Sequence, residues 1–216
     1  MNTGFANLDT LKEHLLAAAL RATTTYDEQL IDLGLGMAGL IEQFCNRKFS
    51  RLVNDTAVFP ADRCEFLLPR TPLESVSLVE VKILEADGWV TQTDPNFIRA
   101  VDLANGIVDC GPGDAGPYYG QVRFTFTGGL FWNTLEPDDA NFPAALPTGA
   151  TVLPDELRLA WLLQCKHVWQ TIDPRGVKIV AGTAEGKAVP QQVFGDLDLI
   201  PQVKSLIRQF IRYSLV

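Results

Sequence analysis

Apolar residues recur every three or four positions at both ends of the chain, whereas apolar and polar residues alternate in its middle. Near the N-terminus, Leu11, Leu15 and Ala18 fall on one helical face. Thr10 and Glu13 have the spacing of a capping box, in which each side chain satisfies a free backbone N–H of the first turn. The pattern predicts a helix that begins at Thr10.

The same capping spacing returns at Thr25 and Glu28 and predicts a second helix after a short loop. The apolar stripe of this helix consists of Leu30, Leu33, Met37, Leu40, Ile41 and Phe44. Gly34, Gly36 and Gly39 match the dinucleotide-binding fingerprint as a string, but no strand precedes them to aim a helix at a pyrophosphate. Close helix packing is therefore the preferred interpretation of these glycines.

Residues 54–127 are rich in β-branched and aromatic side chains, with Pro or Gly every few positions, which predicts a small antiparallel sheet. One strand is expected over 76–84, with a hairpin turn at Asp87-Gly88 and a return strand from Trp89. A second tight turn is expected at Asn105-Gly106.

Val122, Phe124 and Phe126 alternate with polar residues, as in a half-buried strand that we expect at the edge of the sheet or covering it. The stretches 111–120 and 128–151 hold many Gly, Pro and Asp residues. They predict exposed loops that are available for contacts between subunits.

Pro154 suits a first helical position, and the helix expected from Pro154 to about Gln170 is apolar nearly all round. Such a helix must be buried, at the centre of the fold. Cys165 and His167 lie in it, but helical side chains two positions apart point about 200° away from each other and cannot converge on one atom. His167 is interpreted as a packed or interface histidine.

Residues 175–200 combine mixed charge, several glycines and weak periodicity, as is typical of an extended arm. A last helix is expected between Pro201 and Tyr213. Its apolar face holds Val203, Leu206, Ile207, Phe210 and Ile211, and its basic stripe holds Lys204, Arg208 and Arg212. Two interpretations stay open: a terminal helix docked on its own domain, or an arm that inserts into a neighbour with an acidic surface.

Together these elements predict an α+β fold. We expect a helical bundle from residues 1–53 and 152–172, and a small antiparallel β module with long loops inserted at 54–151. An extended C-terminal arm, 173–216, should end in a helix.

Charge and cysteine usage narrow the function. The 18 basic and 26 acidic residues give a net charge of −8, which argues against a surface built to neutralise phosphates. No window approaches the about 18 apolar residues needed to cross a bilayer, so we expect no membrane phase and synthesis in the cytoplasm. The cysteines lie far apart in the sequence and are expected as free, mostly buried thiols, without zinc or redox pairing. They are Cys45, Cys64, Cys110 and Cys165.

No catalytic residue, cofactor site or metal site is predicted. The loop carboxylates Asp138 and Asp139, or Asp109 and Asp114, leave a carboxylate-dependent hydrolase as an alternative. However, no base, nucleophile or oxyanion signature accompanies them, and such carboxylates commonly serve turns and solubility.

Five short segments follow one another between residue 8 and about residue 170: LKEHL, IEQFCNRKF, LPRTPLESVSLVEV, FTFTGG and LPDELRLAWLLQCKHVW. In this order they resemble the head-to-tail connector (adaptor or head-completion) proteins of tailed bacteriophages. The resemblance implies a structural virion protein at the head-tail junction. It would form a ring, commonly of twelve copies, between the portal and the tail or tail-completion proteins.

In that family the helical bundle builds the ring and the C-terminal segment reaches the portal, so residues 200–216 would face the portal. The implied docking residues are Val203, Lys204, Leu206, Ile207, Arg208, Phe210, Ile211 and Arg212. Genomic DNA would pass through the ring without specific binding, which suits an acidic chain because a negative lumen repels phosphates. The alternative is another neck component, such as a stopper, although a stopper should be mostly β barrel.

Overall fold

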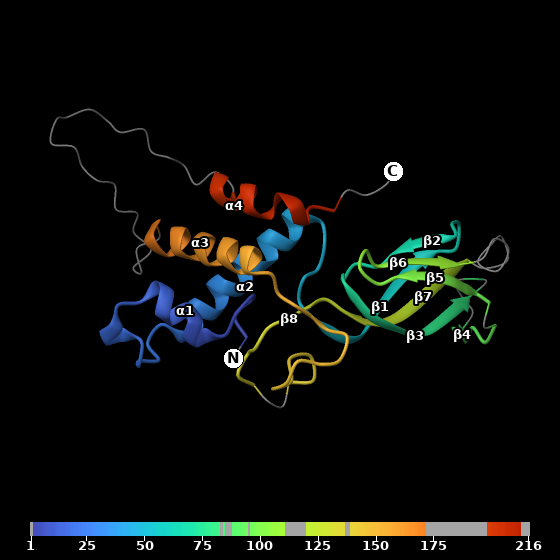
Figure 1. The fold of residues 1–216 in the computed structure, drawn as a ribbon, viewed down its shortest axis with the longest axis horizontal. Coiled ribbons are helices and arrows are strands. Elements are labelled where there is room, and N and C mark those ends of the chain that lie inside the picture. The colour runs from blue at the N-terminus through green and yellow to red at the C-terminus, as the bar shows by residue number, and fades with distance from the viewer. Residues whose placement is uncertain are drawn as a thin grey trace. The chain divides into compact units, whose positions relative to one another are not determined.

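The chain divides into two compact units. The computed structural model describes residues 2–82, 84, 88–94, 96–110, 120–136, 139–171 and 198–212. The helical unit consists of Met1–Cys45 and Pro154–Val216, and the β unit consists of Asn46–Leu153 (Figure 1). The β unit is thus inserted between the two segments that build the helical unit.

Four α-helices lie in the described part of the helical unit: α1 (Leu8–Leu15), α2 (Asp27–Cys45), α3 (Asp155–Thr171) and α4 (Pro201–Ile207), with short 3₁₀ helices at Ala18–Leu20 and Arg208–Phe210. The predicted start at Thr10 is wrong. Asn7 caps α1, because its Oδ1 accepts the Thr10 N–H at 2.9 Å, and Thr10 therefore lies inside the first turn.

Helices α2 and α3 pack through Trp161 and Gly34. The fully buried Trp161 donates its Nε1–H to the Gly34 carbonyl at 2.8 Å. A Cβ on Gly34 would lie 2.2 Å from the Thr3 carbonyl oxygen, whereas a Cβ on Gly36 or Gly39 would meet nothing within 4 Å. Close packing is confirmed at Gly34 and wrong at the other two glycines.

Helix α3 is not buried all round. Its buried side chains are Leu157, Ala160, Trp161, Leu162, Gln164, Cys165 and Val168. Leu159 is 49% exposed and His167 also lies at the surface, so the apolar sequence of α3 still leaves one face open. The expectation of a packed His167 is therefore wrong, while its interpretation as an interface residue stays a prediction.

The β unit contains two antiparallel sheets and a short parallel pair. The larger sheet has the order β1-β7-β3-β4, the second has the order β2-β6-β5, and β8 pairs with β9. The strands are β1 (Leu52–Pro60), β2 (Glu65–Leu67), β3 (Leu73–Lys82), β4 (Val90–Thr91), β5 (Ile98–Asp102), β6 (Ile107–Cys110), β7 (Gln121–Gly128), β8 (Leu130–Phe131) and β9 (Thr151–Val152).

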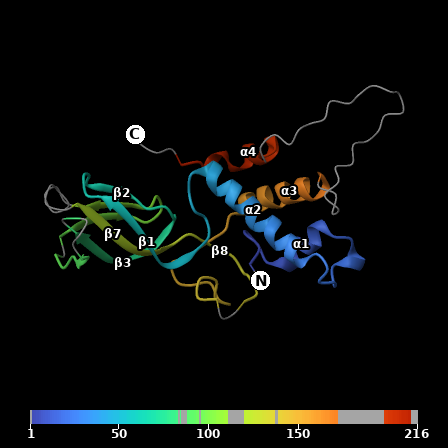
Figure 2. The same ribbon diagram turned by 180° about the vertical axis from the view of Figure 1, so that it is seen from behind.

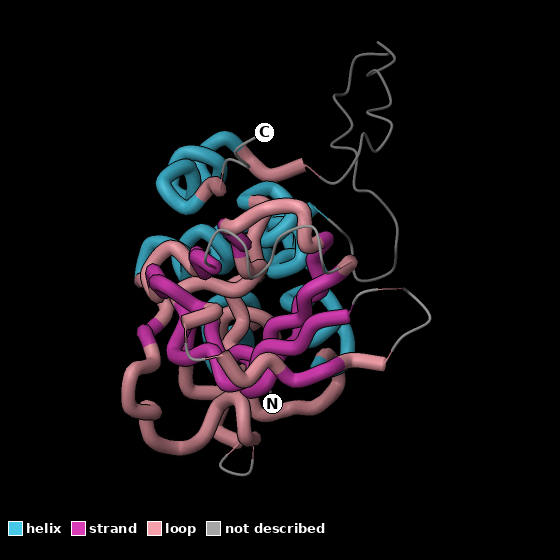
Figure 3. Tube along the Cα trace, turned by 90° about the vertical axis from the view of Figure 1, so that its right-hand side faces the viewer, coloured by secondary structure: helices cyan, strands magenta, loops and turns pink. Residues whose placement is uncertain are grey.

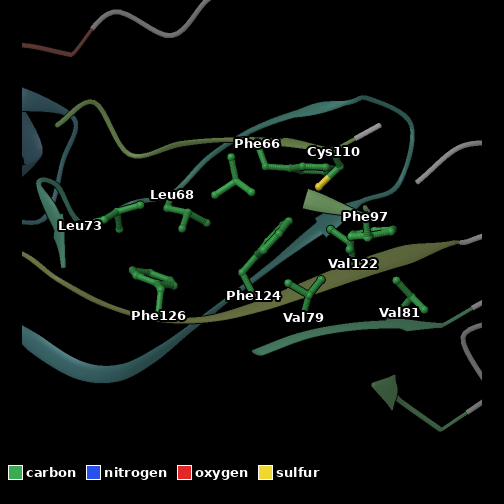
Figure 4. Packing of buried hydrophobic residues seen from close by; sticks show 11 residues of the cluster. Phe66, Leu68, Leu73, Val79, Val81, Phe97, Cys110, Val122, Phe124 and Phe126 are labelled. Carbon is green, nitrogen blue, oxygen red and sulfur yellow. The ribbon is translucent and has the colours of Figure 1, made fainter. Parts of the chain in front are cut away.

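Strand β7 is central, and its expected place at an edge is wrong. It pairs with β1 on one side and β3 on the other, while Val122, Phe124 and Phe126 are fully buried. The side chains on the other face of β7 are half-buried. A central strand can therefore show the same alternation of apolar and polar residues as an edge strand. Figure 4 shows Phe124 reaching toward Phe66, and their ring centroids lie 5.1 Å apart.

Both hairpins of the β unit are antiparallel, as expected. Strand β4 pairs with β3 at Glu80 and Val81. Strands β5 and β6 join through Gly106, whose φ of +70° explains the glycine in this turn. Asp87, in the other turn, lies outside the described residues.

The stretch 128–151 was expected to be an exposed loop, and much of it is buried. The rings of Trp132 and Phe142 contact each other at a tilt of 39°, with centroids 4.4 Å apart, and both residues are at most 6% exposed. The loop runs along the bottom of Figure 3. Its entry passes close to β1: Gly129 has a φ of +105°, and a Cβ there would lie 2.5 Å from the Ser50 carbonyl oxygen.

The chain is an α+β protein, and its description as a helical bundle with a small β module is wrong. The described residues hold nine strands in three sheets beside four helices. Helices α1 and α4 have only eight and seven residues, which is too short for the length of a bundle. The β unit instead has its own core, formed where the side chains of the two antiparallel sheets meet. Of the predicted arm, 173–216, residues 173–197 and 213–216 lie outside the described residues.

Candidate partner-binding site

The segment that leads into α4 is held by the side-chain amide of Gln164 on α3. Its Nε2–H donates to the Asp198 carbonyl at 3.3 Å, and its Oε1 accepts the Ile200 N–H at 3.1 Å. Gln164 is 1% exposed, and Leu199 between the two contacts is also buried. A buried amide needs such partners, so these bonds fix where α4 begins.

Helix α4 then packs through one side. Val203 and Ile207 are fully buried, and Figures 1 and 2 both show α4 alongside α3. Beyond the 3₁₀ helix that follows α4, the Arg212 N–H donates to the carbonyl of Cys45, the last residue of α2, at 2.9 Å. The described part of the C-terminal segment is therefore docked on its own unit.

In the predicted basic stripe, Lys204 forms an ion pair with Asp198. Lys204 Nζ lies 2.7 Å from Asp198 Oδ2. This hydrogen bond is the main cause that holds the pKa of Asp198 below its ordinary value, and the Leu199 N–H contributes as well. The pair is well exposed, so its contribution to stability is small.

The outer side of α4 and of the 3₁₀ helix that follows it borders a shallow surface pocket. Its lining residues are Ser205, Leu206, Arg208 and Gln209, with Glu156 from the first turn of α3. Leu206 is half-buried and Arg208 is exposed. An apolar side chain, a guanidinium and a carboxylate thus lie together in an open depression.

The structure divides the predicted docking residues into three groups. Val203 and Ile207 face inward, whereas Lys204, Leu206 and Arg208 reach the surface. Phe210, Ile211 and Arg212 are half-buried in and after the 3₁₀ helix. Gln164 and Glu156 were not among the predicted residues. The available signal for Gln164 was its place as a lone polar residue between Trp161 and Cys165 on an apolar helix.

Two of the carboxylates considered for a hydrolase, those of Asp109 and Asp139, belong to described residues. Asp139 Oδ1 accepts the Asn141 N–H at 2.8 Å, which closes a turn. Asp109 pairs in register with Glu65 across β6 and β2. Asp114 and Asp138 lie outside the described residues. In the described part of the chain, no three His, Cys, Asp or Glu side chains gather where they could hold a metal ion.

The cysteines are free thiols, three buried and one, Cys64, exposed, as expected. Within the described ranges, no helix has the length and apolar character needed to cross a membrane.

Comparisons with known proteins give matches at the level of structure. No protein-family model matches the sequence. No curated protein matches it either. A chain from the neck of an empty gene transfer agent (GTA) particle, computed with C6 symmetry, is similar with a TM-score of 0.57 and 17% identity.

Two further structures agree. A chain from the neck of the native particle, computed with C12 symmetry, has a TM-score of 0.50, and a chain from the native virion has 0.52, both at 18% identity. Each match covers 97% of this chain and 90% of the other. The protein therefore shares its fold, over nearly its full length, with chains of GTA neck and virion structures.

Proposed function

We propose that this protein is a non-enzymatic virion component of the neck, a head-to-tail adaptor that forms a ring between the portal and the tail or tail-completion proteins. The carrying observation is the shared fold over 97% of the chain with a GTA neck chain. The C6 and C12 symmetries of the similar necks favour a homo-oligomeric ring, and twelve copies fit both. Assembly would take place in the host cytoplasm.

The net charge of −8 supports a ring through which DNA passes without specific binding. Carboxylates near a channel repel phosphates at close range, so the ring would neither grip DNA during packaging nor retain it during ejection.

The portal-docking element in this proposal is the outer side of α4. Val203 and Ile207 are buried within the helical unit and cannot contact a partner. A partner would instead contact Leu206 and Arg208, which line the surface pocket. The half-buried apolar side chain and the exposed cation suit an apolar partner surface rimmed with carboxylates.

The test uses the full chain, because a truncation before Ile200 would also uncover α3. The mass in solution is measured alone, with portal-containing particles and with tail-completion proteins, for the wild type and for Leu206→Asp and Arg208→Glu. Each substitution is expected to weaken portal binding at least about tenfold, as the loss of a central interface contact does. Gln202→Ala, an exposed position on the same helix, is the matched control and should bind as the wild type does.

Three results would contradict parts of this proposal. A protein that stays monomeric and ignores the portal would overturn the adaptor role. Binding only to tail-completion proteins would instead identify a stopper. Portal binding that is unchanged in both variants would remove α4 as the docking element while leaving the adaptor role in place.

A further inference from the structure

Two cysteines that are far apart in the sequence lie opposite each other in the smaller antiparallel sheet. Strands β2 and β6 pair Glu65 with Asp109 and Phe66 with Val108. One step further along the same register, Cys64 faces Cys110, and the Cys110 N–H donates to the Cys64 carbonyl at 2.8 Å. The backbone hydrogen bond shows that the pairing continues to these two residues.

The register places both side chains on one face of the sheet, because side chains directly opposite each other in an antiparallel pair point the same way. Phe66 and Val108, two positions along each strand, are both buried on this face. A hydrogen-bonded pair of this kind has Cα atoms about 5.5 Å apart, within the about 4.4–6.8 Å that disulfides take. The Cα separation therefore suits a disulfide. The Cβ atoms of such a pair lie up to about 5.5 Å apart, so closure requires the two strands to approach by about 1 Å, to the about 3.5–4.5 Å that disulfides take.

The two thiols differ in access. Cys64 is exposed, whereas Cys110 is fully buried in the core of the β unit, as Figure 4 shows. Burial, with smaller contributions from Asp109 and Cys64, raises the pKa of Cys110 to about 12. Cys64 is thus the thiol that a soluble oxidant reaches, and Cys110 is the thiol that follows.

We propose that Cys64 and Cys110 are a cross-strand redox pair that closes to a disulfide when the protein meets a soluble disulfide such as oxidised glutathione. The Cys64 thiolate attacks the oxidant and releases one glutathione thiolate. The Cys110 sulfur then loses its proton, attacks the Cys64 sulfur and releases the second glutathione. Both cysteines are oxidised, two electrons pass to glutathione disulfide, and two glutathione molecules leave.

The cross-link would hold an edge strand. Strand β2 has three residues, and among the described strands it pairs only with β6. In a reducing cytoplasm the pair stays open, and outside the cell it closes. The proposal does not depend on the role in the neck, so the failure of one leaves the other untouched.

The test treats the reduced, full-length protein with oxidised glutathione and follows its intact mass. The expected product has lost the mass of two hydrogen atoms, and trypsin should release peptides 64–70 and 100–123 joined by a reducible bond. Closure should raise the Tm of the β unit by about 5–15 °C, and a reductant should reverse this rise.

Two variants separate the steps. Cys110→Ala should retain glutathione on Cys64, because nothing displaces it, and Cys64→Ser should gain neither a cross-link nor the rise in Tm. A wild-type protein that stops at the glutathione adduct, that forms only dimers through Cys64, or that does not react would overturn the proposal.

Discussion

Arg51 links the long loop between β8 and β9 to Glu74 in β3, and substituting it tests how much these contacts contribute to stability. Its Nε and Nη2 contact the two carboxylate oxygens of Glu74 at 2.6 and 2.8 Å. Its Nη1 donates to the carbonyls of Ala140 and Asn141 at 3.2 and 2.7 Å. The Arg51 side chain is 6% exposed and that of Glu74 is 10% exposed, so water cannot replace these contacts.

The substitution Arg51→Met keeps most of the side-chain volume and removes the charge. It leaves the Glu74 carboxylate buried without its counter-ion, and it leaves two loop carbonyls without their donor. Breaking a buried ion pair by removing one partner costs about 3–5 kcal/mol. At about 2–4 °C for each kcal/mol in a chain of this length, the Tm should fall by about 6–20 °C.

Urea unfolding followed by circular dichroism measures the free energy of unfolding, and hydrogen exchange measures the release of residues 132–150. The control is Arg63→Met, because the side chains of Arg63 and its partner Asp62 are 59% and 64% exposed and their ion pair is worth at most about 1 kcal/mol. The double variant Arg51→Met/Glu74→Leu should regain part of the loss, because it removes the unpaired carboxylate. An Arg51→Met protein as stable as the control would refute the reasoning.

Two further predictions concern the helical unit and a hairpin turn. Gly34→Ala should destabilise the protein by about 1–3 kcal/mol or more, because its Cβ would lie 2.2 Å from the Thr3 carbonyl oxygen. Gly36→Ala, in the same helix with open space around it, should stabilise by about 0.5–1 kcal/mol, and equal effects in urea unfolding would contradict this contrast. The side-chain hydrogen bond from Asn105 lowers the pKa of Asp102, so its stabilising effect is present at neutral pH and is lost as the pH falls through that lowered pKa. In an NMR titration Asn105→Ala should return the pKa of Asp102 toward its ordinary value, and an unchanged pKa would show that the turn does not set it.

Features encoded by neighbouring residues could be predicted from the sequence. The two long helices follow from apolar spacing, and the β5–β6 turn follows from a glycine that adopts a positive φ. The central place of β7 could not be predicted, because alternation reports that one face is buried and does not report how many strands pair beside it. Contacts between residues far apart in the sequence could not be predicted either, because local patterns do not report which distant residues meet. Arg51 and Asn141 are 90 positions apart, and only the fold brings them together.

The candidate site also shows that a local sequence pattern does not identify the surface against which a residue packs. An apolar stripe on a terminal helix predicts that some surface covers it, and it does not say whose surface. In α4 the stripe is divided: Val203 and Ile207 are covered by the chain itself, and Gln164 fixes the entry of the helix. The two interpretations of this helix are therefore compatible, because a helix docked on its own unit can still present its outer side. The surface around Leu206 and Arg208 is thus formed before a partner binds. Binding there would not include the entropy cost of ordering a free arm.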